Sequence, residues 1–372
     1  MYGASRSLLA LIEQLHKRGH ECFVLLPQRG RLTDVLDARS IGYAVTQWRG
    51  WMSPERFSWC HRMLSAMKAF VLNLRYVRRA ARVCVGFAPD VVHTNTSRTA
   101  FGSMLARRLG VPHTWHFREF LGGAFSGGME FSLGRAVSCA WVRKSSSAVV
   151  LVSETLRSQF IRHLYRVPVY VVHNGVMSLD EMKKAAVPLP VSRPFTLALV
   201  GRYDSCKQPF VALHAVRRLR DEGLEVKLLM AGDGREDDVR EVGAFVAKNR
   251  LEAQIEVLGF VHDVSELYAR SHVLLMCSRS DAFGRVTAES MAYGRPVLGA
   301  DSGANPELIK DGFNGFLFRS GDAADLASKI RTLLADPVML EQMGRNAAET
   351  AREKFTNEKY GELMERIFLS VL

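Results

Sequence analysis

Residues 280–307 read SDAFGRVTAESMAYGRPVLGADSGANPE, and this stretch decides how the rest of the chain is interpreted. It follows a short apolar run, His272 to Met276, whose length suits one buried strand. A helix is predicted from about Val286 to Tyr293. The order strand, loop and helix start is typical of an anion site, because the first N–H groups of a helix have no partner within it and carry the positive end of its dipole.

The predicted donors at this helix start are three backbone amides, those of Gly284, Arg285 and Val286. Gly284 also lets the backbone approach a ligand closely, because glycine has no Cβ.

Two acidic residues flank the turn, Asp281 just before it and Glu289 eight positions later. Carboxylates repel a bare phosphate but accept hydrogen bonds strongly from hydroxyl groups. A sugar nucleotide offers both an anionic diphosphate and hydroxyl groups, so the pair favours that ligand. For either residue alone, a helix-capping acid or an ordinary surface glutamate is the competing interpretation.

The segment DAFGRVTAE, residues 281–289, resembles the Glu-x7-Glu motif of the family 4 glycosyltransferases, which are retaining enzymes of the GT-B fold. The following MAYGRPVLGADSGANPELIKDGFNGFLF is similar to the continuation of that family. The resemblance implies that Asp281 contacts the transferred sugar, that Glu289 binds ribose hydroxyls, and that Phe283 lies among the substrate-binding residues. The family usually has Glu at the first acid, and the shorter Asp281 changes the reach of that carboxylate.

A second cluster follows an earlier predicted strand, in FTLALVGRYDSCKQ from Phe195 to Gln208. Arg202 and Lys207 come directly after the strand, at the start of a helix, and cations at this spacing suit a diphosphate. Two solvated surface cations are the alternative. The resemblance implies that these two residues hold the donor's diphosphate and that Val261, at the end of another strand, lies beside the nucleotide base.

A third cluster lies in PHTWHFREF, residues 112–120, where a histidine, an arginine and a glutamate crowd a strand end. A lone histidine is most often structural. This segment resembles the HxRE-like segment of many family 4 enzymes, and the resemblance implies that His116 faces the donor sugar.

The chain opens with a Gly3-Ala4-Ser5 segment and a helical pattern before its first predicted strand, CFVLL. In the resembled enzymes a strand precedes a glycine-containing loop that touches the donor diphosphate and the acceptor. The resemblance therefore implies that Gly3 lies in that loop. We expect an upstream strand, encoded within about ten to fifteen residues ahead of Met1.

Basic charge is concentrated in the first half, with 24 Lys and Arg against 10 Asp and Glu in residues 1–180, and 26 against 28 afterwards. A basic surface attracts phosphorylated substrates, anionic lipid or nucleic acid, or only keeps the protein in solution. Between Pro54 and Gly86, apolar residues recur on one helical face beside an arginine cluster. Such a helix either lies on an anionic membrane or packs into the core. We find no basic motif interleaved with aromatic residues and expect no nucleic-acid partner.

A chain of 372 residues suits two domains, and its six cysteines show no C-x-x-C pair, so they are expected to be reduced packing residues. No run approaches the roughly 18 apolar residues of a membrane span. With no Asp-x-Asp pair or histidine cluster, we expect no metal and no cofactor beyond the sugar nucleotide.

Strands and helices alternate through both halves, which predicts an α/β protein of two doubly wound domains facing across a cleft, as in the GT-B fold. The expected boundaries are 1–178 for the acceptor side and 179–355 for the donor side. The resemblance to GT-B proteins implies that a helix in 356–372 crosses back to the first domain.

We expect a retaining, metal-independent hexosyltransferase that moves a sugar to a glycan or lipid-linked acceptor in cell-surface polysaccharide synthesis. It would be cytoplasmic, with peripheral contact to the inner membrane face. A nucleotide-sugar epimerase of similar fold, or a non-catalytic sugar-nucleotide or nucleic-acid binder, remains the alternative.

Overall fold

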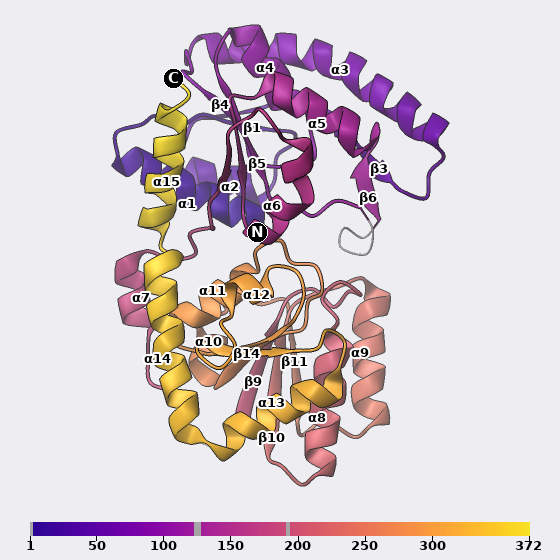
Figure 1. Ribbon diagram of the computed structural model, residues 1–372, viewed down its shortest axis with the longest axis vertical. Coiled ribbons are helices and arrows are strands. Elements are labelled where there is room, and N and C mark those ends of the chain that lie inside the picture. The colour runs from indigo at the N-terminus through magenta and orange to yellow at the C-terminus, as the bar shows by residue number, and fades with distance from the viewer. Residues whose placement is uncertain (1–2, 123–127, 191–193) are drawn as a thin grey trace. The chain divides into compact units, whose positions relative to one another are not determined.

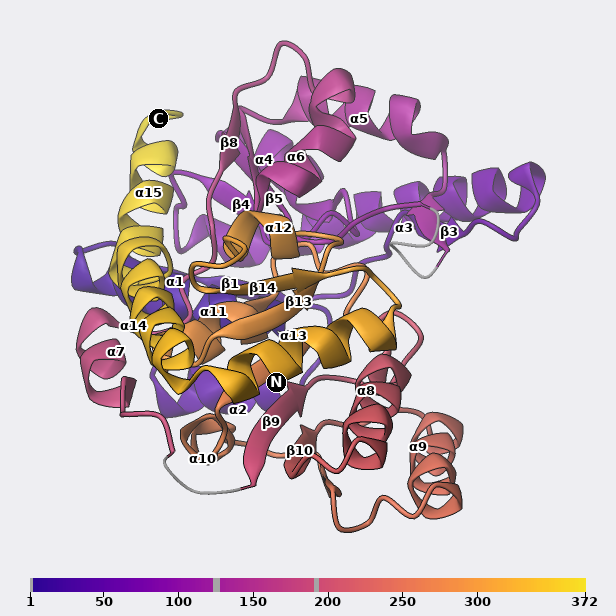
Figure 2. The same cartoon turned by 60° about the horizontal axis from the view of Figure 1, so that its bottom comes forward.

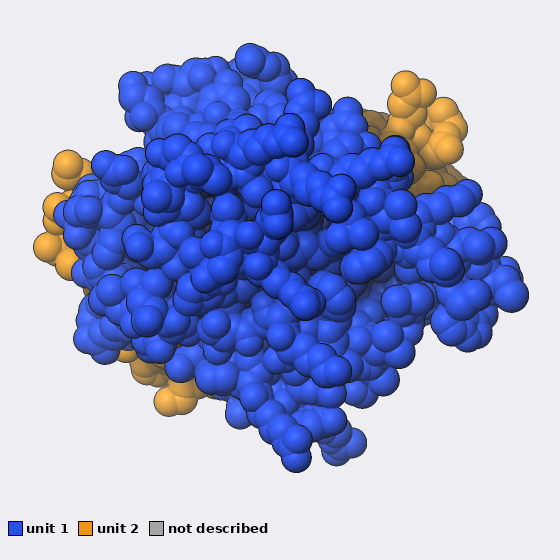
Figure 3. All heavy atoms as spheres, turned by 90° about the horizontal axis from the view of Figure 1, so that it is seen from above, with its two compact units in different colours: residues 1–175, 357–372 blue, residues 176–356 orange. Residues whose placement is uncertain are grey.

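The computed structural model describes residues 3–122, 128–190 and 194–372 (Figures 1 and 2). The chain divides into two compact units, which Figure 3 colours separately. Unit 1 comprises Met1–Gly175 and Asn357–Leu372, and unit 2 comprises Val176–Thr356. Because the last sixteen residues return to unit 1, that unit is discontinuous in sequence.

The strands of unit 1 form three small sheets. In chain order the strands are β1 (Val24–Leu26), β2 (Tyr43–Val45), β3 (Met52–Pro54), β4 (Val92–Thr94), β5 (His113–Phe117), β6 (Met129–Phe131), β7 (Ala148–Leu151) and β8 (Val169–Val171). Four of them pair in the order β4-β5-β7-β8, all parallel, while β1 and β2 form a separate parallel pair and β3 and β6 an antiparallel one. Strands β5 and β7 are buried along their whole length, as expected for a parallel sheet covered on both faces.

The helices of this unit contribute to three apolar clusters of the described residues. They are α1 (Gly3–Lys17), α2 (Arg31–Ala38), α3 (Trp59–Val85), α4 (Phe101–Leu109), α5 (Gly134–Ser145), α6 (Glu154–Phe160), the 3-10 turn Ile161–His163 and α15 (Asn357–Leu369). Helices α1 and α15 lie side by side, with Gly361 so close to Gln14 that a Cβ there would come within 2.3 Å of the glutamine side chain. Helices α3 and α4 pack together in a separate cluster, and α2 packs with α1 and β1 in the third.

Helix α3 does not pack its large apolar residues into the core, which was one of the two alternatives that the sequence left open. Its core side consists mainly of small residues, Ala66, Ala69, Asn73, Val77, Ala80, Ala81 and Cys84. The larger residues that were candidates for core packing are exposed, among them Met67 at 57% and Val71 at 56%. Small side chains allow α4 to approach α3 closely, and this leaves the bulkier apolar stripe outside.

Unit 2 contains one parallel sheet of six strands in the order β11-β10-β9-β12-β13-β14. They are β9 (Phe195–Val200), β10 (Val226–Ala231), β11 (Ile255–Gly259), β12 (Val273–Met276), β13 (Val297–Ala300) and β14 (Gly315–Phe318). The chain winds outward from β9 through β10 to β11 and then returns to the other side of β9 at β12. In doubly wound sheets, ligands bind at such a switch point, outside the carboxyl ends of the strands.

The helices of unit 2 are α7 (Leu179–Ala185), α8 (Pro209–Asp221), α9 (Glu236–Lys248), α10 (Ser265–Arg270), α11 (Arg285–Ala292), α12 (Asn305–Leu308), α13 (Ala323–Ala335) and α14 (Pro337–Lys354). Helix α8 packs against α13, and α11 packs against α14 (Figure 2). The core contains fully buried residues of β9, β10 and β12 together with apolar residues of α8 and α13.

Arg295 is a fully buried cation that braces unit 2. Its guanidinium donates to five backbone carbonyls, those of Tyr268 (2.8 Å), Val187 (2.7 Å), Tyr293 (2.9 Å), Ala269 (3.0 Å) and Pro188 (3.2 Å). These bonds join the turn before β13 to α10 and to the segment after α7. Burial lowers the pKa of Arg295 to about 10, which still leaves it charged at neutral pH.

The alternation of strands and helices expected from the sequence is confirmed in both units. The expected loop at Gly3-Ala4-Ser5 is wrong, because these residues already form the first turn of α1. Glycine destabilises a helix mainly when it lies in the interior, so it is tolerated at the first position. Within the part of the chain that the structure describes, no helix has the length and hydropathy of a membrane span.

Candidate active site

Hydrogen bonds join the loops that follow β9, β12 and β13 at the switch point of unit 2. The amide of Arg279 and the hydroxyl of Ser278 both donate to the carbonyl of Cys206, at 3.0 and 3.2 Å. The hydroxyl of Ser302 donates to the carbonyl of Arg279 at 2.6 Å. Three segments far apart in sequence therefore form one rigid edge at the carboxyl ends of the strands.

Lys207 and Asp281 form an ion pair across this edge. The ammonium donates to both carboxylate oxygens, Oδ1 at 2.7 Å and Oδ2 at 2.6 Å. Both side chains keep contact with solvent, with exposed fractions of 28% and 21%. The pair thus joins the lysine from the β9 loop to the acid from the β12 loop, at the surface where a ligand would arrive.

The backbone around Asp281 is held by close packing against the β13 loop. The amide of Ala304 donates to the carbonyl of Asp281 at 2.9 Å. Gly303 has φ of +59°, and a Cβ there would lie 2.8 Å from the same carbonyl oxygen. Only glycine fits this contact without a shift of the backbone.

Helix α11 begins directly after Gly284, which has φ of +78° and therefore lies in the left-handed region. The helix starts at Arg285, one residue earlier than the sequence pattern indicates. Its first amides lie in the segment that carries Asp281, which is the arrangement expected for a site that receives an anion at a helix start.

Glu289 lies in the second turn of α11 and is only 3% exposed. Arg285 donates from Nη2 to Oε1 at 3.1 Å, and the hydroxyl of Tyr268 donates to Oε2 at 3.4 Å. Glu289 is therefore neither a helix cap nor an ordinary surface glutamate.

The other predicted residues of unit 2 occupy three different environments. Arg202 is 60% exposed and pairs with Asp204 at 2.7 Å, in the same loop as Lys207. Phe283 is buried and packs edge-on against Phe355 at 5.6 Å between ring centroids, so its ring supports the loop. Val261 follows β11 and is half-buried.

His116 lies in β5 of unit 1 and is fully buried. Arg118 donates to its Nδ1 at 3.1 Å, so Nδ1 is the acceptor and Nε2 carries the hydrogen. Burial, and secondarily the charge of Arg118, lowers the pKa of His116 well below its usual value, which keeps the ring neutral. Among the described residues Nε2 has no hydrogen-bond partner. The imidazole is thus a buried donor with unused capacity.

Arg118 is the residue that fixes His116, and the sequence pattern did not single it out for this role. Its Nε donates to Asn95 at 2.8 Å, its Nη2 donates to the hydroxyl of Tyr360 at 2.7 Å, and its Nη1 donates to Asn174. It therefore connects the ends of β4 and β8 with α15. Such a role depends on residues distant in sequence, and only the clustering of His, Arg and Glu in HFRE hinted at it.

Glu119 is likewise a brace. Its Oε1 accepts from the hydroxyl of Thr96 at 2.8 Å, and its Oε2 accepts from the hydroxyl of Ser97 at 2.9 Å.

The predicted site residues are divided between the two units. His116 and Gly3 belong to unit 1, whereas Lys207, Asp281, Gly284 and Glu289 belong to unit 2. In unit 1, His116 contacts Arg118; in unit 2, Lys207 pairs with Asp281 and Glu289 pairs with Arg285.

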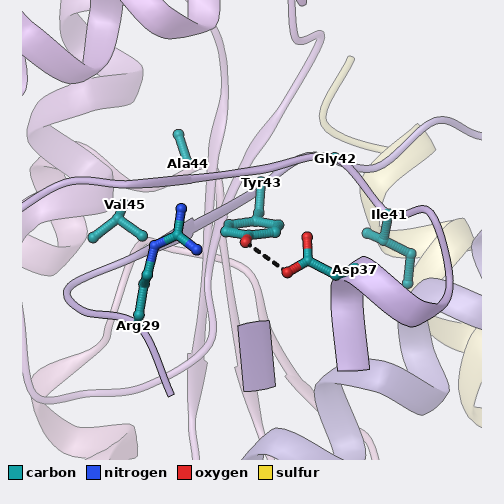
Figure 4. A pocket seen from close by; sticks show the side chains of 7 residues that line it. All are labelled: Arg29, Asp37, Ile41, Gly42, Tyr43, Ala44 and Val45. Carbon is teal, nitrogen blue, oxygen red and sulfur yellow. Dashed lines mark hydrogen bonds between the residues drawn. The ribbon is translucent and has the colours of Figure 1, made fainter. Parts of the chain in front are cut away.

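A pocket of about 490 Å³ lies beside β2 in unit 1 (Figure 4). Tyr43 donates there to Oδ2 of Asp37 at 3.0 Å, and Arg29 lines the same pocket. The bond to Asp37 raises the pKa of Tyr43. None of the predicted site residues lines this pocket.

Across the described ranges, no group of three or more His, Cys, Asp or Glu side chains is arranged to hold a metal ion.

Two family models match nearly the whole chain between them. Residues 1–177 match the model described as Glycosyltransferase Family 4, and residues 181–350 match the model described as Glycosyl transferases group 1.

Among curated proteins, the chain is 35% identical over 149 residues to N-acetyl-alpha-D-glucosaminyl L-malate synthase of Bacillus anthracis, which covers 40% of this chain and 39% of that protein. It is 29% identical over 239 residues to D-inositol 3-phosphate glycosyltransferase of Streptomyces bingchenggensis, covering 58% and 51%. The match spans about half or less of the length of these two relatives.

The fold matches solved structures over its whole length. Anabaena Alr3699/HepE in complex with UDP aligns with a TM-score of 0.79 at 20% identity, covering 99% of this chain and 96% of that one. The same protein in complex with UDP-glucose aligns at 0.77. Sucrose-phosphate synthase from Thermosynechococcus elongatus aligns at 0.72, covering 98% and 92%.

Proposed function

The chain belongs to the family 4 glycosyltransferases and has their α/β GT-B fold, and from this we propose that it is a retaining glycosyltransferase. It moves a sugar from a nucleoside-diphosphate sugar to a glycan or lipid-linked acceptor, in the synthesis of a cell-surface polysaccharide. The observation that carries the proposal is the ion pair between Lys207 and Asp281 at the switch point of unit 2.

Unit 2 supplies the donor-binding residues in this proposal. Lys207, Arg202 and the first amides of α11 bind the diphosphate, and Asp281 binds the sugar. The ion pair supports these roles, because Asp281 holds the ammonium at the loop edge while leaving part of it open to solvent. Arg202 lies in the same loop and is exposed enough to move to a ligand.

The reaction proceeds on one face of the sugar. The bond between the anomeric carbon and the diphosphate oxygen breaks, and its electron pair leaves with the diphosphate. The acceptor hydroxyl oxygen bonds to the anomeric carbon from the same side, and its proton passes to the departing phosphate oxygen. Fixed cations and amides stabilise the developing charge, which is the usual source of a large rate effect in such sites.

His116 contributes a hydrogen bond to the sugar. Its buried Nε2–H has unused donor capacity among the described residues, and its neutral ring is fixed by Arg118. Both properties suit a donor to a sugar hydroxyl.

The function is tested by product analysis with UDP-glucose as the first donor, chosen because a structural neighbour binds it. Release of UDP that depends on an added glycan or lipid-linked acceptor, with retention at the anomeric carbon, supports the transferase. Release of free nucleotide without acceptor indicates an epimerase. Binding without any release indicates a sugar-nucleotide binder, and either of these results overturns the proposal.

Replacing Glu289 with Gln should weaken the binding of UDP by about ten- to a hundredfold. We propose that Glu289 accepts from ribose hydroxyls, and hydrogen bonds to a charged group contribute about 1.5–3 kcal/mol. The amide keeps the shape of the side chain, so thermal unfolding should show a folded protein. Calorimetry measures the affinity.

The matched control for that variant is Glu256→Gln. Glu256 pairs with Lys227 at 2.6 Å near the amino end of β10, away from the proposed site. Unchanged UDP affinity in Glu289→Gln, or an equal loss in the control, would contradict the ribose role.

Helix α3 supports a peripheral contact with an anionic membrane surface. Residues 59–85 contain six Lys and Arg and no Asp or Glu. The exposed apolar stripe, Trp59, Met63, Leu64, Met67, Phe70, Val71 and Leu74, precedes the exposed arginines 75, 78, 79 and 82. An exposed apolar face beside basic residues is typical of helices that lie in a membrane interface.

Replacing Arg78 and Arg79 together with Gln should reduce binding to vesicles containing anionic phospholipid by about thirtyfold, because each basic residue near such a surface contributes about 1 kcal/mol. Co-sedimentation measures this partition. The control is Arg240→Gln with Arg345→Gln, which removes the same charge from exposed ion pairs of unit 2. Equal losses in both double variants, or equal binding to neutral vesicles, would count against α3.

A further inference from the structure

Two exposed arginines lie in the loops that follow the carboxyl ends of β2 and β4 in unit 1. Arg49 follows β2, and Arg98 follows β4. Neither guanidinium makes an ion pair or a hydrogen bond with any residue that the structure describes. We call these two residues the arginine pair. An exposed arginine is ordinary by itself, so the way in which each backbone is held is the informative observation.

The backbone of Arg49 is fixed by a buried asparagine. Asn73 is 3% exposed on the core face of α3, and its side chain accepts from the amide of Arg49 at 2.8 Å and donates to its carbonyl at 3.0 Å. The hydroxyl of Thr99 donates to the same carbonyl at 3.3 Å. Burying an amide side chain is costly unless its hydrogen bonds are made, and here the asparagine makes them to one residue of another segment.

Two tryptophans hold the segment on either side of Arg49. The ring of Trp48 stacks on Phe101 with 5.1 Å between the centroids. The ring of Trp51 stacks on Trp115 with 5.4 Å between the centroids and 8° between the planes. Arg49 is therefore an exposed side chain on a rigid support.

Arg98 lies against the same support. The amide of Trp51 donates to the carbonyl of Arg98 at 3.1 Å, and a Cβ on Gly50 would lie 3.0 Å from that oxygen. The amide of Arg98 donates to the hydroxyl of Thr96 at 3.2 Å, and this hydroxyl donates to Glu119 at 2.8 Å. The two arginine-bearing loops are thus joined, and the carboxylate near them is engaged by the loop itself.

The arginine pair also lies close to the histidine loop of unit 1. Strand β4, which leads to Arg98, pairs with β5, which contains His116. Asn95 follows β4 directly and accepts at 2.8 Å from Arg118, the residue that fixes His116. The arginine pair therefore belongs to the loops beside the histidine to which we assign the transferred sugar.

We propose that the arginine pair binds a phosphate group of the acceptor, attached to the sugar that receives the transferred unit. This inference rests on the proposed function and narrows its acceptor to one that bears phosphate. A guanidinium group is planar and presents parallel N–H donors that match two oxygens of a phosphate. Because the arginine backbones are fixed before the acceptor binds, less conformational entropy is lost on binding.

Two sources supply such a phosphate, a soluble sugar phosphate and a lipid diphosphate. Asn73, which holds Arg49, lies in α3 between the exposed Phe70 and Leu74. The arginine pair is thereby joined to the helix that we propose lies on the membrane, and this connection favours the lipid.

Calorimetric titration in the presence of saturating UDP tests the arginine pair without any turnover. The probes are glucose linked through diphosphate to a decyl chain, decyl glucoside without phosphate, and glucose 1-phosphate. The parent protein should bind the decyl diphosphate probe about tenfold or more tightly than decyl glucoside. Binding of glucose 1-phosphate with equal affinity would identify a soluble acceptor, and a much weaker affinity would identify the lipid.

Replacing Arg49 and Arg98 together with Gln should remove this preference for the phosphorylated probe. The affinities for decyl glucoside and for UDP should not change, because neither depends on the arginine pair. The matched control is Arg107→Gln with Arg108→Gln, which removes the same charge from the exposed last turn of α4, toward the amino end of β5. This control should keep the preference, and thermal unfolding should show that both double variants are folded.

Equal affinities of the parent protein for the two decyl probes would overturn the proposal. Equal losses in the Arg49/Arg98 and Arg107/Arg108 variants would overturn it as well, because the effect would then come from net charge alone. A failure of UDP itself to bind would count against the donor site of the proposed function instead, so the two failures are distinguishable.

Discussion

Replacing Lys207 with Ala should lower the turnover number by about a hundredfold or more. The ammonium is held within hydrogen-bond distance of both oxygens of Asp281 at the edge where we propose the diphosphate leaves. Its removal takes away a fixed positive charge, and it also releases Asp281 from its position. Because the developing charge is largest in the transition state, the loss should appear mainly in kcat and less in the affinity for UDP-glucose.

The matched control is Lys227→Ala. Lys227 also pairs with one acid, Glu256, at 2.6 Å and has a similar exposed fraction of 32%. It lies in the first half of β10, toward the amino end of the sheet, so its removal should leave turnover within about twofold. Steady-state kinetics with the purified variants measures the turnover number of each. Full activity in Lys207→Ala would remove the observation on which the proposed function depends.

Replacing Arg295 with Met should lower the free energy of unfolding by about 4 kcal/mol, because each buried carbonyl left without a donor costs about 1–3 kcal/mol. The carbonyl of Tyr268 still accepts from the amide of Ser271, so we expect a total near the lower end of that range for the five. The methionine fills similar space but leaves five carbonyls without the donor that they share. Unfolding in urea, followed by circular dichroism, measures the change. The midpoint of unit 2 should shift more than that of unit 1, since every partner of Arg295 lies in unit 2.

Arg331→Met is the control for this prediction. Arg331 also makes short bonds, to both oxygens of Glu222 at 2.8 Å, but it is 42% exposed. Exposed ion pairs contribute about 0–1 kcal/mol, so this variant should be nearly as stable as the parent. If Arg295→Met unfolds with the same free energy as Arg331→Met, the guanidinium is not the brace that its contacts indicate.

The local pattern predicted most of what happens within one element and at its ends. The strand, loop and helix start around Gly284 could be predicted from the sequence, because a glycine between an apolar run and a helical pattern is a local signal. Residues 281–289 also carried the family resemblance; the family is confirmed by the models that match residues 1–177 and 181–350, and the GT-B fold by the structural match over 99% of the chain. The roles of individual site residues stay predictions that the variants above test.

Helix α3 shows where a periodic pattern fails. Its apolar period is clear, yet the pattern could not tell which side would be buried, because alanines and one asparagine form the core face. The choice depends on how closely α4 can approach, and this distance is a property of two helices together. Phe283 is a similar case, since its burial depends on Phe355, far away in sequence.

The sequence by itself determined the family, the α/β fold, and the residue types available for binding a diphosphate and a sugar. The family rests on the resemblance of residues 281–289 and their continuation. The α/β fold follows from short-range spacing, because a strand, a turn and a helix start are set mainly by neighbouring residues. Only the tertiary structure decided that Lys207 meets Asp281, that Arg118 fixes the tautomer of His116, and that a cavity is lined by residues of both β1 and β4. Each of these joins segments that become neighbours only when parallel strands assemble, so no local pattern along the chain could specify them.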